Sequence, residues 1–222
     1  MCHTSCITFG VVNLRPEEIK GKRIIEIGSK NSNGGLRPII ESWEPAKYIG
    51  TDLSEGLGVD VIFDAENILQ RFEEDSFDVV ISTEVLEHVR NWRKVLSNIK
   101  NICCPKGIIL ITTRSYGFVY HPSPTDFWRY EIEDMAFCFS DCEILVLERD
   151  CQFPGVFIKA RKPDLFTEQD LSSHPLYSMV AGKKVLQIAD KDFKSFHFKR
   201  LVLREKLTGF ADRLSTIAIS RI

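Results

Sequence analysis

Three residues suited to holding a nucleoside each stand directly after a short apolar run: Gly28, Asp52 and Asp64. A glycine lets the backbone approach a ligand closely. The carboxylate of Asp52 could accept hydrogen bonds from both ribose hydroxyls and would repel a 2′-phosphate. Asp64, followed by Ala65, could read the amino edge of a purine. The pattern therefore predicts a binding site for a nucleoside-containing ligand.

The loop after the first apolar run departs from the dinucleotide-binding fingerprint. Residues 28–35 read GSKNSNGG, whereas a dinucleotide-binding fold shows G-x-G-x-x-G. The loop opens a predicted helix, whose N-terminus favours negative charge. This difference counts against a nicotinamide-dependent enzyme.

A second group of polar and aromatic side chains lies in residues 114–130 (RSYGFVYHPSPTDFWRY). Aromatic faces beside polar groups, on a loop held by a rigid scaffold, suit a ring-shaped or sugar-like substrate. His88 and His121 have the intrinsic pKa of a general base and are the catalytic candidates. The candidate substrate-binding residues are Arg114, Tyr116, Asp126, Trp128 and Arg129.

Each of these residues also has a structural interpretation. Trp128 is expected to pack the loop onto a sheet, and Asp126 could cap the next helix. His88 could be a core histidine bonded to a backbone carbonyl. Asp52 taken alone is more often a cap or a surface carboxylate than a ligand contact.

No metal site is expected. His3 with Cys2 and Cys6 (CHTSC) has too few ligands for structural zinc. The seven cysteines are odd in number and scattered, unlike the framework of a small disulfide-rich secreted domain. We therefore expect reduced thiols and a cytoplasmic protein, since no secretory signal or membrane-spanning run is evident.

The overall charge limits the classes of partner. The chain of 222 residues has a formal net charge of −2, but residues 182–222 contain ten Lys or Arg against four Asp or Glu. The remaining body is acidic and would repel a nucleic acid, so nucleic-acid binding is disfavoured.

Short apolar runs alternate with helix-compatible segments, which is the spacing of repeated βαβ units. Residues 84–100 have helical apolar spacing. The last two runs are too close together for a parallel crossover, so they are expected to be antiparallel neighbours. The fold class is therefore α/β: a Rossmann-like, doubly wound, mostly parallel sheet with one antiparallel strand. The predicted strands are residues 23–27, 48–51, 59–63, 77–82, 107–113, 143–149 and 155–161.

Five ordered segments (EIG, IGTDLS, DAEN, FDVVISTEVLEHV and GIILITT) resemble the class I S-adenosylmethionine-dependent methyltransferases. The closest resemblance is to the branch that carries EVLEHV after the fourth strand. It covers about residues 22–162, and the order and spacing of the segments make it specific. The resemblance implies a seven-stranded sheet and S-adenosylmethionine as the cofactor.

The same resemblance implies roles for individual residues. Glu26 and Gly28 would border the methionine part of the cofactor, and Asp52 would hold the ribose. Many relatives have glycines where this chain has Lys30 and Ser32, so the contact to the methionine carboxylate could involve Lys30 or Asn31. The implied cofactor-binding residues are Glu26, Gly28, Ser29, Asp52, Leu53, Asp64, Ala65, Ser82, Thr83 and Glu84.

The chain is accordingly divided into an N-terminal segment (1–21), a methyltransferase domain (22–162) and a basic C-terminal extension (163–222). Apolar residues in 190–217, Phe193 to Ile217, fall on one helix face. This face could cover the body, form a dimer or lie on an anionic membrane surface as a peripheral contact.

The predicted function is an S-adenosylmethionine-dependent methyltransferase acting on a small-molecule or glycan-linked acceptor. The segment H-x-x-P-x-D-[FY]-W-R-[FY] is similar to one in relatives found near glycan-assembly enzymes, and it carries the sugar hypothesis. The alternative is a non-catalytic, cofactor-binding partner or regulatory module.

Overall fold

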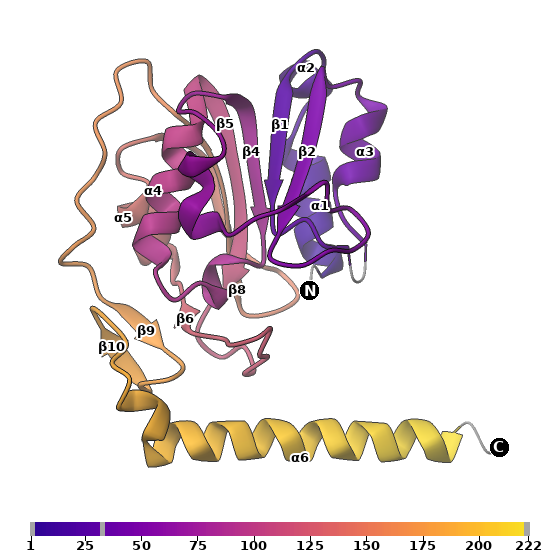
Figure 1. The fold of residues 1–222 in the computed structure, drawn as a ribbon, viewed down its shortest axis with the longest axis vertical. Helices are drawn as coiled ribbons and strands as arrows, with labels where there is room; N and C mark the ends of the chain where they lie inside the picture. Colours follow the sequence, from indigo (N-terminus) through magenta and orange to yellow (C-terminus); the bar gives the residue numbers. More distant parts are fainter. Residues whose placement is uncertain (1–2, 32–33, 220–222) are drawn as a thin grey trace.

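A computed structural model describes residues 3–31 and 34–219 of the chain, with side chains as far as residue 208. Its centre is a seven-stranded sheet of order β3-β2-β1-β4-β5-β8-β7 (Figure 1). All neighbouring strands pair in parallel except β8, which is antiparallel to both β5 and β7. The strands are β1 (Arg23–Ile27), β2 (Lys47–Asp52), β3 (Val61–Ile62), β4 (Phe77–Thr83), β5 (Cys103–Arg114), β7 (Glu143–Arg149) and β8 (Gly155–Arg161).

The predicted fold class is confirmed, including the antiparallel pair near the edge of the sheet. Helices cover both faces because the strands are apolar on both sides. Ile24 of β1 belongs to one core cluster, and its neighbour Ile25 belongs to the other. One face is covered by α1 (Thr4–Asn13), α2 (Pro16–Ile19) and α3 (Arg37–Ser42), and the other by η1 (Ala65–Gln70), α4 (Trp92–Ile102) and α5 (Ile132–Cys138).

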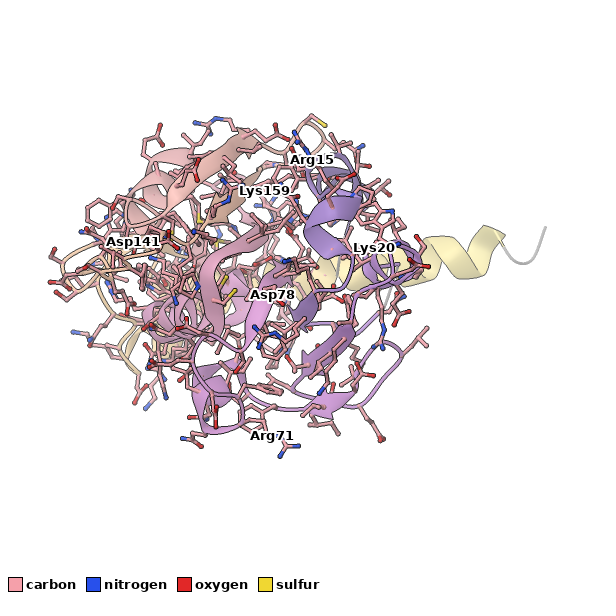
Figure 2. All side chains as sticks on the ribbon, turned by 90° about the horizontal axis from the view of Figure 1, so that it is seen from above. Arg15, Lys20, Arg71, Asp78, Asp141 and Lys159 are labelled. Carbon is pink, nitrogen blue, oxygen red and sulfur yellow. The ribbon has the colours of Figure 1, made fainter. Side chains whose placement is uncertain are left out.

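Ion pairs support the sheet away from its carboxyl edge. Asp78, at the start of β4, accepts a hydrogen bond from the Arg23 backbone N–H at 2.8 Å. Lys159 of β8 donates to Glu18 of α2 at 2.7 Å and so attaches that helix to the sheet. Figure 2 looks toward the amino ends of the first strands, with Asp78 near the middle of the view.

The predicted helix over residues 84–100 is wrong in its first half. Glu84 has φ +58°, and residues Leu86–His88 form a short 3₁₀ turn, η2; the helix α4 begins only at Trp92. Glu87 is fully buried and accepts a hydrogen bond from the Thr113 hydroxyl at 2.9 Å. The segment therefore bends to bury polar side chains at the end of the sheet, which a regular helix at this place would not do.

A small second sheet joins the later part of the chain to the main body. Its order is β10-β9-β6, with β6 (Trp128–Arg129), β9 (Leu176–Ser178) and β10 (Lys183–Val185). Leu176 and Val180 belong to the main core cluster. Residues beyond 162 are thus packed into the body at least as far as this sheet.

The C-terminal helix α6 (Phe196–Ile219) follows a short turn, η3 (Asp192–Lys194), and projects away from the body (Figure 1). Its first turn is anchored, since the ring of Phe198 meets those of Tyr120 and Phe193 edge to face. Leu203 and Leu207 are exposed and do not cover the body. Phe210, Leu214 and Ile217 lie outside the described side chains. Within the described residues, no helix is long and apolar enough to cross a membrane.

Candidate functional site

A cavity of about 370 Å³ opens at the carboxyl ends of β1, β2 and β4. We call it the main cavity. It is where an open α/β sheet is expected to bind its ligand, because loops from separate strands meet there. Nine of the ten predicted cofactor residues line it. They are Glu26, Gly28, Ser29, Asp52, Leu53, Asp64, Ala65, Thr83 and Glu84.

Glu26 forms one wall of the main cavity and is nearly inaccessible to solvent. Its carboxylate accepts a hydrogen bond from the Tyr48 hydroxyl at 2.5 Å. Burial raises the pKa of Glu26 to about 6, although the Tyr48 hydrogen bond opposes the shift. At neutral pH this is a buried anion that a ligand ammonium group would stabilise.

Position 28 requires a glycine because of its backbone conformation. Its φ is +78°, a conformation that side chains disfavour. The next residue, Ser29, is buried, and its hydroxyl has no hydrogen-bond partner within the described chain. An unpaired buried hydroxyl on a cavity wall fits a site completed by a polar ligand.

Asp52 stands at the tip of β2, with its two oxygens near the backbone N–H groups of Lys30 (3.4 Å) and Ser54 (3.2 Å). These long contacts orient the carboxylate and leave its acceptor capacity largely free. Leu53 is exposed at the rim, and Lys30 and Asn31 also line the main cavity. The structure thus brings together Asp52, which is predicted to bind the ribose, and Lys30 and Asn31, the two candidates for binding the methionine carboxylate.

Asp64 both caps a helix and lines the main cavity. Its Oδ1 accepts a hydrogen bond from the Glu66 N–H at 2.8 Å and caps η1, while the residue lines the main cavity together with Ala65. Ser82 is different, because it is buried within β4 and is absent from the cavity wall. Its neighbours Thr83 and Glu84 are the residues of this strand end that reach the ligand space.

Arg114 is wholly buried and lies away from the main cavity. Its guanidinium pairs with Glu84 and, at 3.0 Å, with Asp150, and its Cζ atom lies 4.4 Å from the centre of the Phe118 ring. Asp150 also accepts a hydrogen bond from Ser5 of α1 at 2.8 Å. Contrary to the prediction of a substrate contact, Arg114 joins the ends of two strands to the N-terminal helix.

Asp126 and Arg129 form a second buried ion pair, with Arg129 Nη2 2.6 Å from Asp126 Oδ2. Burial would raise the pKa of Asp126, but hydrogen bonds from Arg129 and His121 outweigh it, so the pKa is lowered and the carboxylate stays charged. Trp128 is buried and donates its indole N–H to the Val89 carbonyl at 3.0 Å. In the structure all three hold residues 115–127, the β5–β6 loop, in place and are not exposed to a substrate.

Tyr116 is exposed, but it lines a separate and more open hollow near β8 and stacks edge to face on Tyr177. The part of the β5–β6 loop that does reach the main cavity is Ser123 and Pro124. Sequence reasoning missed both residues, because a serine followed by a proline in a loop is equally typical of an ordinary turn.

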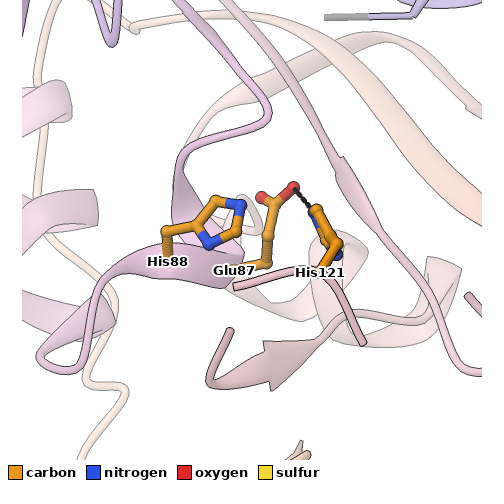
Figure 3. Close-up of side chains that lie close together, drawn as sticks. All are labelled: Glu87, His88 and His121. Atoms are coloured by element: carbon orange, nitrogen blue, oxygen red, sulfur yellow. Dashed lines mark ion pairs between the residues drawn. The ribbon is translucent and has the colours of Figure 1, made fainter. Parts of the chain in front are cut away.

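Of the two predicted catalytic histidines, only His88 is among the residues that line the main cavity. Its ring centre is 4.7 Å from that of His121. Burial lowers the pKa of His88, so its imidazole is neutral near pH 7. Glu87, which the sequence analysis did not single out, lies between them, with Oε1 3.8 Å from His121 Nε2 (Figure 3).

Comparison with known proteins gives a consistent picture. The model of a family described as a methyltransferase domain matches residues 9–171. The phthiotriol/phenolphthiotriol dimycocerosates methyltransferase 1 of Mycobacterium ulcerans is 32% identical over an alignment of 107 residues, and the match covers 43% of this chain and 38% of that protein. The ubiquinone biosynthesis O-methyltransferase of Sinorhizobium fredii is 29% identical over an alignment of 120 residues, and the match covers 49% of this chain and 47% of that protein.

The matched region spans less than half the length of these two curated relatives. Among solved structures, an S-adenosylmethionine-dependent methyltransferase from Mesorhizobium loti superposes with a TM-score of 0.53 at 18% identity. The similarity covers 68% of this chain and 95% of that one. At this identity the likeness concerns the fold.

Proposed function

The chain belongs to the methyltransferase domain family, with S-adenosylmethionine as its cofactor, and we propose that it methylates a hydroxyl oxygen on a small-molecule or glycan-linked acceptor. The observation that carries the proposal is the continuity of one cavity. It runs from the buried carboxylate of Glu26 past Asp52 to the imidazole of His88. A cofactor and an acceptor group could therefore meet in one cavity.

The proposed cofactor contacts follow from the charges along the cavity. Glu26 would take the ammonium group of the methionine part, and Asp52 would accept hydrogen bonds from the ribose hydroxyls. Asp64 and Ala65 would meet the adenine edge, with Leu53 against its face. S-adenosylmethionine supplies an electrophilic methyl group on a sulfonium, and the protein chiefly orients it.

The residues at the other end would prepare the acceptor. A hydroxyl oxygen that forms a bond to the methyl carbon must lose its proton, and His121 Nε2 or His88 Nε2 can receive it. The carbon–sulfur bond breaks in the same step, so S-adenosylhomocysteine is the second product. Positioning of the two groups in line would supply much of the rate acceleration.

The names of the two curated relatives bear on the acceptor, and one of the names supports an oxygen atom. One relative is named an O-methyltransferase of ubiquinone biosynthesis, and another acts, by its name, on phthiotriol and phenolphthiotriol dimycocerosates. The glycan-linked alternative rests on the similarity of residues 121–130 to relatives near glycan-assembly enzymes. Since Asp126, Trp128 and Arg129 are internally bonded, we assign that segment a supporting role for the site.

Calorimetric titration with S-adenosylmethionine, S-adenosylhomocysteine and NAD tests the first half of the proposal. We expect binding of the two sulfur compounds and none of NAD. Formation of S-adenosylhomocysteine is then followed by mass spectrometry with phenols, methyl glycosides and long-chain alcohols as acceptors. Cofactor binding with no turnover on any of them would favour the non-catalytic module instead. A folded sample that binds neither sulfur compound would overturn the proposal.

A further inference from the structure

We propose that Glu87, His88 and His121 form a binding site for one divalent transition-metal cation of the zinc type. Each residue offers one ligand atom, and the three atoms lie within 4.8 Å of one another. Two come from the turn after β4 and one from the β5–β6 loop (Figure 3). The proposal rests on the proposed function, because this end of the main cavity is where the acceptor would enter.

The hydrogen bonds of the two imidazoles favour metal binding. Nδ1 of His88 lies 2.9 Å from the Thr125 carbonyl oxygen, and Nδ1 of His121 lies 3.0 Å from Asp126 Oδ2. Both neighbours are oxygens without a hydrogen, so each Nδ1 must carry the proton that is donated. In the neutral imidazole with this tautomer, each Nε2 carries a lone pair that can face the cluster. Carboxylate or carbonyl groups that fix a ligating histidine in this way are typical of metal sites.

The atoms that face the cluster lack other partners. Glu87 Oε1 and His88 Nε2 are both buried, and neither has a hydrogen-bond partner within the described residues. Glu87 is fully inaccessible, and its other oxygen, Oε2, is held by the Thr113 hydroxyl at 2.9 Å. A buried carboxylate oxygen and a buried lone pair without partners are costly, and a shared cation would satisfy both.

The dimensions require only a small closure of the cluster. Zinc–nitrogen and zinc–oxygen bonds of about 2.0–2.2 Å in a tetrahedron place ligand atoms about 3.4 Å apart. The distance from His121 Nε2 to Glu87 Oε1 is 3.8 Å. Since the three ligand atoms lie within 4.8 Å of one another, a shift of about 1–1.5 Å by the His121 ring, whose side chain is 23% exposed, would complete the geometry.

Two nitrogens and one carboxylate oxygen leave at least one coordination position open. Structural zinc sites are closed by four protein ligands, whereas three ligands with an open position are typical of sites that bind a substrate or water. His88 lines the main cavity, so the open position would face the proposed acceptor. The cation would then take over the activating role assigned above to the free imidazoles, because both Nε2 atoms would be coordinated. It would bind the acceptor oxygen directly and favour loss of its proton to solvent water.

The test is metal binding by the full-length protein after treatment with a chelator. Titration with Co²⁺ is followed by its visible absorption, and Zn²⁺ by competition and by metal analysis. We expect one equivalent of metal per chain. Glu87→Gln and His121→Asn should each weaken binding at least tenfold, while His197→Ala, an exposed histidine bonded to the Met179 carbonyl, should leave it unchanged.

S-adenosylmethionine affinity, measured on the same samples, reports whether each variant is folded. Should the buried Glu87→Gln chain fail to fold, the partly exposed His121→Asn variant decides. Absence of metal binding in wild-type protein that binds S-adenosylmethionine would overturn the site, as would equal binding by wild type and His121→Asn. Turnover by metal-free protein would overturn the role in catalysis and leave the proposed function intact.

Discussion

A β-carbon on Gly28, at the end of β1, would lie 2.1 Å from Cγ2 of Val85, at the end of β4. The two strand ends are therefore as close as a glycine permits. Gly28 and Val85 both line the main cavity, so a side chain at position 28 would displace part of the cavity wall against which the cofactor is proposed to lie.

Gly28→Ala is expected to destabilise the fold by at least about 2 kcal/mol, through strain at positive φ and displacement of Val85. Gly21→Ala is a matched control, because Gly21 has φ +70° but no atom within 4 Å of an added β-carbon. Urea unfolding of both variants separates the two effects. Equal losses would show that the contact with Val85 is unimportant.

Asp52→Asn should lower the affinity for S-adenosylmethionine about 10- to 100-fold, because two charge-assisted hydrogen bonds to the ribose would be weakened. Calorimetry measures the change. Glu55→Gln provides the control, since Glu55 is a nearby exposed carboxylate outside the cavity wall. An unchanged affinity in Asp52→Asn would mean that the ribose binds elsewhere.

The raised pKa of Glu26 predicts that the free energy of unfolding depends on pH. Its pKa rises from 4.5 to about 6 on folding, so the folded chain binds the proton more tightly than the unfolded chain. The charged form therefore costs about 2 kcal/mol above pH 6, and this cost disappears as the pH falls toward 4.5. Glu26→Gln should be more stable than wild type at pH 7.5 and about equal to it at pH 4.5. A constant difference across this range of unfolding measurements would contradict the prediction.

The same substitution should have the opposite effect on the cofactor. Glu26→Gln removes the anion proposed to hold the methionine ammonium, so S-adenosylmethionine should bind more weakly at pH 7.5. In wild type, the affinity should fall as the pH drops below 6 and Glu26 takes up a proton. A gain in stability together with a loss of affinity distinguishes a ligand contact from a structural residue. Calorimetry at pH 5 and pH 7.5 measures the second effect.

Arg114→Met should destabilise the protein by about 3–5 kcal/mol, because it leaves the buried carboxylates of Glu84 and Asp150 without their cation. Arg149→Met is the control at an exposed ion pair, where a change within about 1 kcal/mol is expected. Chemical denaturation compares the two. A small loss in Arg114→Met would show that the buried network contributes little to the fold.

Removal of residues 200–222 should change neither the melting temperature nor the affinity for S-adenosylmethionine, because the described side chains beyond the first turn of α6 include exposed Leu203 and Leu207. A large drop in melting temperature would indicate that the helix covers the body after all. Flotation with anionic liposomes, before and after truncation, tests the membrane hypothesis, and sedimentation tests the dimer.

The sequence was sufficient to predict the strands and nine of the residues that line the main cavity, where the cofactor is proposed to bind. Buried parallel strands are continuous apolar runs, so the polar residues at their ends, such as Asp52 and Asp64, can be recognised from the sequence alone. The family resemblance was also confirmed, whereas its EVLEHV branch stays a prediction. Residues 84–88 were read as helix because their apolar spacing continues smoothly into α4.

The acceptor side was less predictable because its contacts are long-range. Arg114 and Arg129 were predicted to bind the substrate, yet the charge of each is neutralised by a buried carboxylate. One partner of Arg114, Asp150, lies on a different loop. Pairing of this kind depends on the folded backbone and leaves no local pattern. Glu87 was overlooked for the same reason, since only the fold brings it to His121.

The small sheet has a consequence for the order in which the site is assembled. Trp128 and Arg129 of β6 pair with β9, and the Met179 N–H bonds the Phe127 carbonyl at 2.8 Å. The part of the cavity proposed to hold the nucleoside is built from residues before 90, whereas the strand that secures the β5–β6 loop comes about 60 residues after that loop begins. During synthesis, the chain would acquire a place for its methyl donor well before the place for its acceptor is fixed.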